Sequence, residues 1–390
     1  MTTLALRATT PRLLTPAFVR LLVVDLGAMT GFYLLLAVVP MHASAHGAGG
    51  LGAGLTTAVL MFASVAGELA TPRVAARVGY RRLLVAGLVL LGAPAFALSW
   101  IVGLGGLLLV GVVRGLGFAI VVTATGALAA GTLPAERRGE GLGLMGVVSM
   151  LPAVTALPAG VWLADRLGTS AVFGLGAVVV LAVVPVCLGL PRDSEQHEEE
   201  SGLASLVRRP GTFAPAVVFA VAAVAGGAVV TFLPSAVAGT AGLAAPALFV
   251  QALTATLARY LGGRHCDRRG PRGLLVPGVA LAAVGMGVVT LTGSPAAVLV
   301  GMAVFGVGFG LVQTASLNLM LAAATPAQYG AVSAAWNVAY DLGWGMGSAA
   351  VGLVVASAGF PVAFAVTAAA VAAMLPLART ISDAGGTRRR

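Results

Sequence analysis

Long apolar stretches and short polar ones alternate along almost the whole chain. A helix needs about 20 apolar residues to cross the ~30 Å hydrocarbon core of a bilayer, and only helices or closed barrels satisfy the backbone there. The pattern therefore predicts an all-α membrane protein with twelve transmembrane helices. The predicted helices cover residues 18–40, 51–71, 83–101, 105–127, 141–163, 171–190, 213–236, 243–262, 273–291, 296–322, 330–356 and 361–377.

One polar interval, residues 191–212, is much longer than the others. It holds an acidic run at 198–200, followed by residues 203–209, which we expect to form a short surface helix. We interpret the interval as a solvated linker, because a charge run usually faces solvent. It divides the chain into a six-helix bundle at 1–190, a cytoplasmic central loop, and a second six-helix bundle at 213–390.

The two predicted bundles share short sequence segments at a fixed spacing. An offset of 191 residues pairs Arg77 and Gly79 with Arg268 and Gly270, residues 114–118 with 305–309, and Gly139 with Gly330. The simplest account is a duplicated unit of roughly 190 residues, a common origin of transporter folds.

Composition excludes a soluble fold. Charged residues are 9% of the chain, against a usual ~25% in soluble domains, so a soluble protein of this size could not cover its surface. The two cysteines, Cys187 and Cys266, lie in different predicted segments, so neither a disulfide nor a metal site is expected. No cofactor is expected either.

The positions of the basic residues explain the net charge of +10 by the orientation of the chain in the membrane, rather than by a nucleic-acid partner. All 23 basic residues are Arg, and all except Arg114, Arg166 and Arg259 fall on one side of the predicted helices. This is the bias of cytoplasmic loops in membrane proteins. We therefore predict a multi-pass protein of the plasma membrane with both termini in the cytoplasm, in contact with the lipid bilayer and without nucleic acid.

A basic turn follows the second predicted helix of each half. The turn at residues 263–272 reads Gly-Arg-His-Cys-Asp-Arg-Arg-Gly-Pro-Arg, and the one at 72–82 is an imperfect copy. Two such turns in twelve helices resemble the major facilitator superfamily, whose loop signature is Gly-x-x-x-Asp-Arg-x-Gly-x-Arg. The matching positions are Gly263, Asp267, Arg268, Gly270 and Arg272 in the second turn, and Arg77, Gly79 and Arg81 in the first, where Pro72 and Ala76 depart from the signature.

The resemblance implies two pseudo-symmetric six-helix bundles, loop charges that latch the cytoplasmic side in one conformation, and transport by alternating access. Arg114 and Gly117 resemble the arginine motif of proton-coupled members in the fourth helix. The fifth helix, with Pro152, Pro158 and Gly160, loosely resembles that of the family's antiporters. The chain is thus similar to drug/proton antiporters with twelve helices.

Few ionisable residues lie inside the predicted helices, and such residues are functional candidates because they are costly in lipid. A rise of 1.5 Å per residue places Asp25, Arg114 and Asp341 near the middle of the bilayer, where we predict proton coupling. Asp25 and Arg114 are expected to pair across the cavity, either as a coupling pair or as a static one. Asp341 is a second protonation site, a substrate contact or a helix cap.

Two further charged residues lie near the predicted cytoplasmic helix ends. Glu68 and Arg259 occupy equivalent positions at the 191-residue offset, where inner gates form in the family. Because the fifth and eighth helices are neighbours in that fold, we expect Arg259 to pair with Glu140.

Polar and aromatic residues on several helices are candidates for lining a cavity, although ordinary packing is the alternative for each aromatic residue and methionine. The candidates are Met29, Phe32, Tyr33, Gln251, Gln313, Asn318, Asn337 and Trp344.

We predict a monomeric secondary transporter that exports small hydrophobic or cationic compounds in exchange for protons. The first alternative is a transporter of a polar metabolite of the sugar or siderophore type. A membrane-embedded enzyme is disfavoured because no cluster of His and carboxylates appears in the helices. A primary pump is excluded within this chain because a phosphate-binding loop needs a Lys, which the chain lacks.

Overall fold

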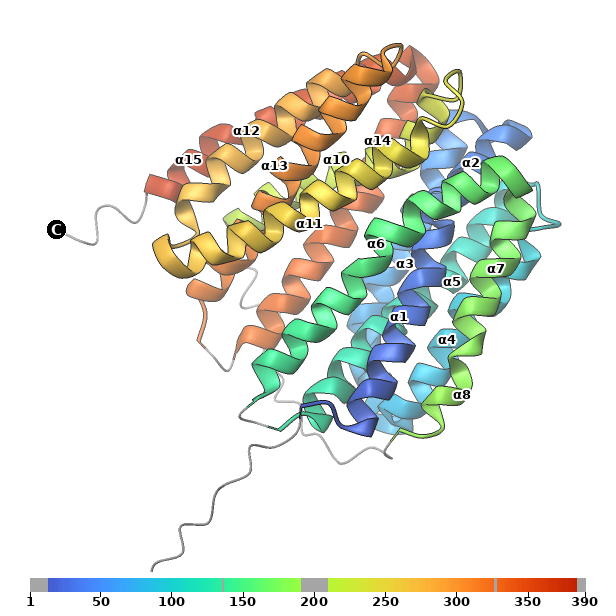
Figure 1. The fold of residues 1–390 in the computed structure, drawn as a ribbon, viewed down its shortest axis with the longest axis vertical. Coiled ribbons are helices and arrows are strands. Elements are labelled where there is room, and N and C mark those ends of the chain that lie inside the picture. The colour runs from blue at the N-terminus through green and yellow to red at the C-terminus, as the bar shows by residue number, and fades with distance from the viewer. Residues whose placement is uncertain (1–12, 135–136, 191–209, 326–327, 384–390) are drawn as a thin grey trace, which may run out of the picture.

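The computed structural model describes residues 13–134, 137–190, 210–325 and 328–383, and these residues form helices and no strand (Figure 1). The expected surface helix at residues 203–209 lies outside them. The N-terminal half contains α1 (Pro16–Leu36), α2 (Val38–Ala43), η1 (Ser44–Ala48), α3 (Gly49–Val78), α4 (Tyr80–Ala97), α5 (Leu104–Thr132), α6 (Arg138–Leu167), α7 (Thr169–Ala182) and α8 (Val184–Cys187). The C-terminal half contains α10 (Pro210–Ala236), α11 (Ala244–Arg269), α12 (Arg272–Val289), α13 (Pro295–Ala322), α14 (Tyr329–Ala372) and α15 (Leu375–Asp383).

Nine stretches of the described residues are long and apolar enough to cross a membrane. The two longest, of 63 and 55 residues, far exceed the ~20 residues of one crossing. Each bends at glycines with positive φ, which are Gly47 and Gly49 in the first and Gly359 in the second. Each of these two stretches therefore makes two crossings. With the 26-residue α11, which has the length of a crossing, the described helices fit the twelve predicted.

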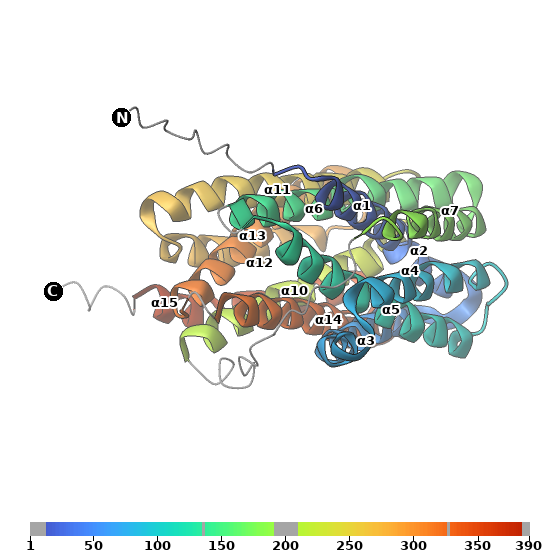
Figure 2. The same ribbon diagram turned by 90° about the horizontal axis from the view of Figure 1, so that it is seen from below.

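Helix boundaries repeat between the halves at the offset found in the sequence. α5 and α13 begin 191 residues apart, at Leu104 and Pro295, and α3 and α11 end 191 residues apart, at Val78 and Arg269. The duplication predicted from the sequence is therefore visible in the backbone, and Figure 2 shows the two halves as bundles lying side by side.

The turns repeat as well. Gly79 and Gly270 have φ of 86° and 82°, and Gly168 and Gly359 have φ of 83° and 81°. The first pair ends α3 and α11, where each glycine N–H donates to a carbonyl four residues earlier, at 2.8 and 2.9 Å. Glycine adopts this left-handed conformation without the steric cost of a side chain, which explains why the basic turns keep it.

Matching glycines also set the distance between neighbouring helices. A Cβ added to Gly117 on α5 would lie 2.8 Å from the carbonyl oxygen of Gly87 on α4. The equivalent Cβ on Gly308 of α13 would lie 2.7 Å from the oxygen of Gly278 on α12. Small residues allow this close approach, which drives helix association in lipid.

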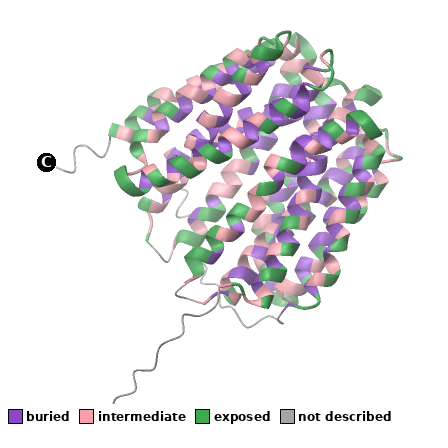
Figure 3. Ribbon diagram, viewed as in Figure 1, coloured by how far each residue is buried: buried purple, intermediate pink, exposed green. Residues whose placement is uncertain are grey.

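We name two sides of the molecule by their charge. The arginine-rich side holds the turns at residues 78–80 and 269–272, and the arginine-poor side holds those at 97–104 and 289–295. Figure 3 shows buried residues concentrated between the helices, whereas large apolar side chains such as Leu109 and Val147 are exposed on outer surfaces, as expected for contact with lipid.

The halves meet mainly through α3 against α14 and α6 against α11. Near the arginine-poor side, Gly50 approaches Val355, and the Thr231 hydroxyl donates to Thr57 and contacts Ser348, both at 3.1 Å. All ten residues at 31–40 are buried. In Figure 1, α6 and α11 diverge toward the arginine-rich side, so the structure is closed on the arginine-poor side.

We expect Gly117→Ala to lower the apparent Tm of the purified protein in detergent, because its Cβ would approach Leu91 N to 2.5 Å and the overpacking costs about 1–3 kcal/mol. Gly126→Ala, on the same helix and facing open space, is the matched control. Equal Tm values for the two variants would contradict the packing role of Gly117.

Candidate functional site

A cavity of about 60 Å³ lies between the halves near the middle of the helices. The N-terminal half contributes residues of α1 and α6, and the C-terminal half contributes residues of α10, α11, α13 and α14. Its polar or amphipathic lining consists of Tyr33, Gln251, Thr256, Arg259, Gln313, Tyr340 and Trp344. The predicted cavity residues Tyr33, Gln251, Gln313 and Trp344 are thus brought together.

Several hydrogen-bonding groups at this cavity are buried. Gln251 and Gln313 are 8% and 6% exposed. The indole Nε1 of Trp344 is buried and has no hydrogen-bond partner among the described residues. A buried donor without a partner costs about 1–3 kcal/mol, so a bound acceptor would be stabilised here.

Arg259 is the one charged side chain in the described lining of the cavity. Its Nη1 donates to the Met150 sulfur of α6 at 3.1 Å, so it bridges the two halves. It also interacts electrostatically with Tyr340 and Tyr33.

The predicted gate pair of Arg259 and Glu140 is wrong. Because α11 continues to Arg269, Arg259 lies ten residues, or about 15 Å, from the helix end. Glu140 instead forms an ion pair of 2.8 Å with Arg137, the residue directly before its own helix α6. The predicted helix was too short because the basic turn forms the last two turns of α11 and contributes few apolar residues.

Stacked aromatic rings support one wall of the cavity. Phe219 and Trp336 stack at 4.3 Å between centroids, and Trp336 lies parallel to Tyr340 at 6.1 Å. Tyr340 in turn contacts Trp344 at 5.3 Å. Sequence reasoning did not identify Tyr340 as a cavity residue or Trp336 as its support, although Trp336, Tyr340 and Trp344 recur every four residues and so share one helix face.

Asp25 and Arg114 are not brought together. Asp25 is 3% exposed and accepts a hydrogen bond of 2.5 Å from Ser149 of α6. Arg114 donates from Nε to the Leu91 carbonyl at 3.2 Å. The expected pairing was inferred from depth alone, which does not determine the direction in which a side chain leaves its helix.

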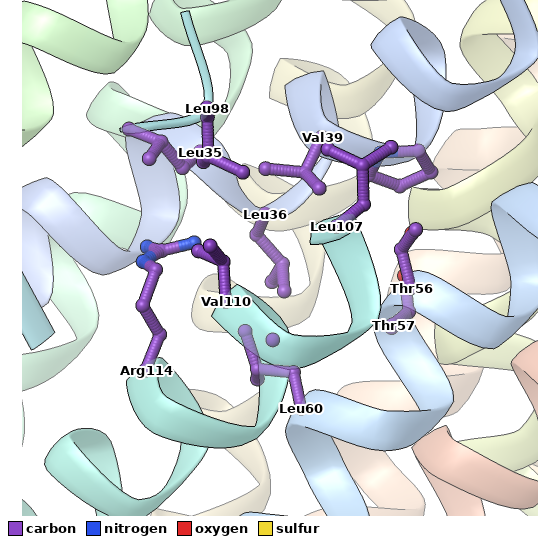
Figure 4. Close-up of a pocket in the computed structure, with 12 residues that line it drawn as sticks. Leu35, Leu36, Val39, Thr56, Thr57, Leu60, Leu98, Leu107, Val110 and Arg114 are labelled. Carbon is purple, nitrogen blue, oxygen red and sulfur yellow. The ribbon is translucent and has the colours of Figure 1, made fainter. Parts of the chain in front are cut away.

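Arg114 lies in a narrow and mostly apolar cleft rather than at the central cavity. Its neighbours in this cleft include Leu35 and Leu36 of α1 and Val110 of α5 (Figure 4). Thr56 and Thr57 are the other polar residues of the described lining. The contacts of Arg114 therefore lie within the N-terminal half.

Asp341 lies near α3 and is not part of the described lining of the cavity. It is 5% exposed, its carboxyl lies beside Ser64, and it interacts electrostatically with Glu68. Glu68 lies ten residues before the end of α3, deeper than predicted, because the basic turn again extends the helix.

The other predicted cavity residues lie outside the described lining. Met29 is buried, and Phe32 stacks on Phe118 with centroids 3.9 Å apart. Asn318 donates to the Thr314 carbonyl of its own helix at 2.9 Å. Asn337 is half-buried on α14, about one turn before Tyr340.

The basic turns are tied to their own halves. Arg81 donates to the Leu188 carbonyl at 2.8 Å, and the Arg272 carbonyl accepts from Ser382 at 3.0 Å. Asp267 and Arg268 are exposed. Latching by the signature residues Arg77, Gly79, Arg81, Gly263, Asp267, Arg268, Gly270 and Arg272 stays a prediction.

Comparisons with known proteins agree with this architecture. A sequence model described as Major Facilitator Superfamily matches residues 21–348. The crystal structure of the nucleoside transporter NupG has a TM-score of 0.76 at 11% identity, over 94% of this chain and 98% of that one. A bacterial homologue of the human lysosomal transporter Spinster, inward-facing and unoccupied, has a TM-score of 0.77 at 14% identity, over 94% and 96%. These identities show the fold alone, and a search of curated protein sequences finds no match.

Proposed function

The chain belongs to the Major Facilitator Superfamily, and we propose from this premise that it carries a small polar metabolite across the membrane by alternating access. Membership makes it a transporter of small molecules rather than an enzyme. The cavity between the two halves is the proposed substrate site, since transporters built from repeats bind at the repeat interface near mid-membrane.

The proposed substrate class is supported by the lining of the cavity, and above all by the unpartnered indole N–H of Trp344. Gln251 and Gln313 offer further donors and acceptors, and Arg259 offers a fixed positive charge. The faces of Tyr340 and Trp344 suit a flat ring. We propose a planar solute that carries hydrogen-bond acceptors and is neutral or anionic.

This proposal replaces export of hydrophobic or cationic compounds as the favoured function. Arg259 repels a cation, and a lipophilic compound would leave the buried Trp344 donor without a partner. The name of NupG, a nucleoside transporter, supports a polar substrate with a flat ring.

We also propose that protons drive transport, that the protein works as a monomer in the plasma membrane, and that the arginine-rich side is cytoplasmic. The distribution of arginine supports this orientation. Buried mid-helix carboxyls such as Asp25 and Asp341 support proton coupling. The cavity would then be inward-facing in this structure.

A panel of solutes tests the substrate class. We expect planar polar solutes, such as nucleosides and aromatic carboxylates, to raise the Tm of the purified protein and to enter proteoliposomes saturably. Arg259→Gln should weaken binding of an anionic solute about 10- to 100-fold, since hydrogen bonds to a charged group contribute about 1.5–3 kcal/mol. Arg264→Gln, one turn further and exposed, is the control. Saturable uptake of a lipophilic cation alone would refute the proposal.

Cysteine labelling in intact cells tests the orientation. In a background with Cys187 and Cys266 replaced by Ser, Asp165→Cys on the arginine-poor side should react with a membrane-impermeant maleimide. Arg268→Cys should react only after the cells are permeabilised, because it lies at the proposed cytoplasmic turn. The reverse pattern would invert the orientation.

A further inference from the structure

A second cavity, of about 730 Å³, lies at the arginine-rich end of the C-terminal half. It is bounded by the start of α10, the turn between α11 and α12, the end of α13, and α15, which packs against α12 and α10 (Figure 1). Its described lining shares no residue with the central cavity and has two charged members, Arg269 and Arg272. The apolar side chains that face it include Pro215, Leu319, Leu377 and Ile381. Its volume falls within the ~300–1,000 Å³ of sites that bind small molecules.

In the N-terminal half, the corresponding elements are tied together by two arginines. Arg20 of α1 donates from Nη1 to the carbonyl of Gly189, just after α8, at 2.5 Å. Arg81 of α4 donates to the preceding carbonyl, that of Leu188, at 2.8 Å. A Cβ added to Gly189 would lie 2.8 Å from Nε of Arg20, so the guanidinium packs directly against the chain. The side chain of Arg20 thus joins the first helix of this half to its last.

The C-terminal half lacks the first of these two ties. The 191-residue offset maps Arg81 onto Arg272 and Gly189 onto Thr380, and both Arg272 and Thr380 line the cavity. The first helix of this half, α10, contains no ionisable residue. Its described members of the lining are Gly211, Ala214 and Pro215. No described side chain of α10 therefore fills this space as Arg20 does in the other half.

The two guanidinium groups at the cavity are available to an anion. Arg269 and Arg272 are exposed, and the contact printed by the structure for Arg272 is made by its backbone carbonyl, which accepts from Ser382 at 3.0 Å. Among the described residues of the surrounding helices, the acids are Asp267 of α11 and Asp383 of α15. Neither comes within 4 Å of a guanidinium. Two like charges at one cavity repel each other, so a bound anion is stabilised there.

The surroundings favour a phospholipid as the source of that anion. The planar guanidinium group binds phosphate oxygens with two parallel hydrogen bonds. Anionic lipids are enriched in the cytoplasmic leaflet, and basic pockets between transmembrane helices on that side bind their headgroups. Leu377 and Ile381 are four residues apart on α15, so this helix presents an apolar face to the cavity. Such a wall suits the glycerol backbone and the first carbons of the acyl chains.

We propose that the cavity at Arg269 and Arg272 binds the phosphate headgroup of an anionic phospholipid from the leaflet on the arginine-rich side. The two guanidinium groups bind the phosphate, and the apolar side chains of α13 and α15 contact the glycerol and acyl carbons. The lipid then has the structural role that Arg20 has in the other half, because it fills the space between the first helix, the basic turn and the last helix. The site is separate from the proposed substrate cavity.

A lipid titration of the purified full-length protein in neutral detergent tests the site. Phosphatidylglycerol should raise the Tm saturably, and phosphatidylcholine should not. The Arg269→Gln/Arg272→Gln double variant should bind phosphatidylglycerol at least about tenfold more weakly, since hydrogen bonds to charged groups are lost. The Arg82→Gln/Arg264→Gln variant removes the same charge from exposed basic-turn positions outside the described lining, and should bind like wild type. Equal affinities of the two double variants would refute the site.

A variant that keeps both arginines tests the cavity itself. Ala214→Leu places extra carbons in the lining and should weaken the Tm shift produced by phosphatidylglycerol, measured from the variant's own Tm without lipid. Ala216→Leu, on another face of α10 and outside this lining, is the matched control and should keep the full shift. An undiminished shift in Ala214→Leu would show that the lipid binds elsewhere on the surface and would overturn the proposal.

Soluble phosphates distinguish a lipid from a free phosphorylated compound. Inorganic phosphate and glycerol 3-phosphate should leave the Tm unchanged, because they lack the acyl carbons that contact the apolar wall. A Tm rise with glycerol 3-phosphate as large as that with phosphatidylglycerol would assign the cavity to a soluble ligand and contradict lipid binding. Since these measurements use no transported solute, their failure would leave the proposed substrate class standing.

Discussion

A charged or hydrogen-bonding group inside a bilayer must find its partner within the protein, and this constraint organises the whole structure. Close glycine contacts bring helices together, and the rare mid-helix charges are placed between those helices. The contact between Gly87 and Gly117 recurs as that between Gly278 and Gly308. The duplicated scaffold therefore repeats this packing and the arginines of its basic turns, whereas the ionisable residues in the middle of its helices differ between the halves.

The divergence of the two halves explains the chemistry of the site. At one duplicated position, the first half carries Glu68 and the second half carries Arg259. Arg259 places a guanidinium at the cavity, where it contacts Met150 of α6. The N-terminal half gives the cavity mainly apolar side chains, whereas the C-terminal half supplies its amides, its indole and its charge. The polar groups that we propose for substrate binding therefore come mainly from the C-terminal half.

The all-helical fold, the repeat and the turns at Gly79 and Gly270 could be predicted from the sequence. Long apolar segments indicate the helices, the fixed spacing indicates the repeat, and a backbone with positive φ favours glycine at the turns. The helix boundaries predicted from the sequence placed Glu68 and Arg259 too close to the membrane surface. The apolar pattern stops where the charged last turns of each helix begin, so the predicted helices were too short. The pairing of Asp25 with Arg114 was predicted from their similar depth in the membrane. The direction of a side chain also depends on the rotation of its helix, which is set by packing against neighbouring helices. Among the cavity residues, Tyr33, Gln251, Gln313 and Trp344 were predicted from the sequence, whereas Thr256 and Tyr340 were not, because residue type does not show which side of a helix faces the cavity.

The central claim is that the two halves move as units around the cavity, separating at the arginine-poor side, where Gly50 now meets Val355. A Cβ on Gly50 would lie 3.0 Å from that of Val355, close enough for a disulfide after a small shift. The most direct test is to cross-link Gly50→Cys to Val355→Cys, with Cys187 and Cys266 removed, and to measure transport before and after reduction. The account predicts no transport when oxidised and recovery when reduced; undiminished transport by the cross-linked protein would contradict it.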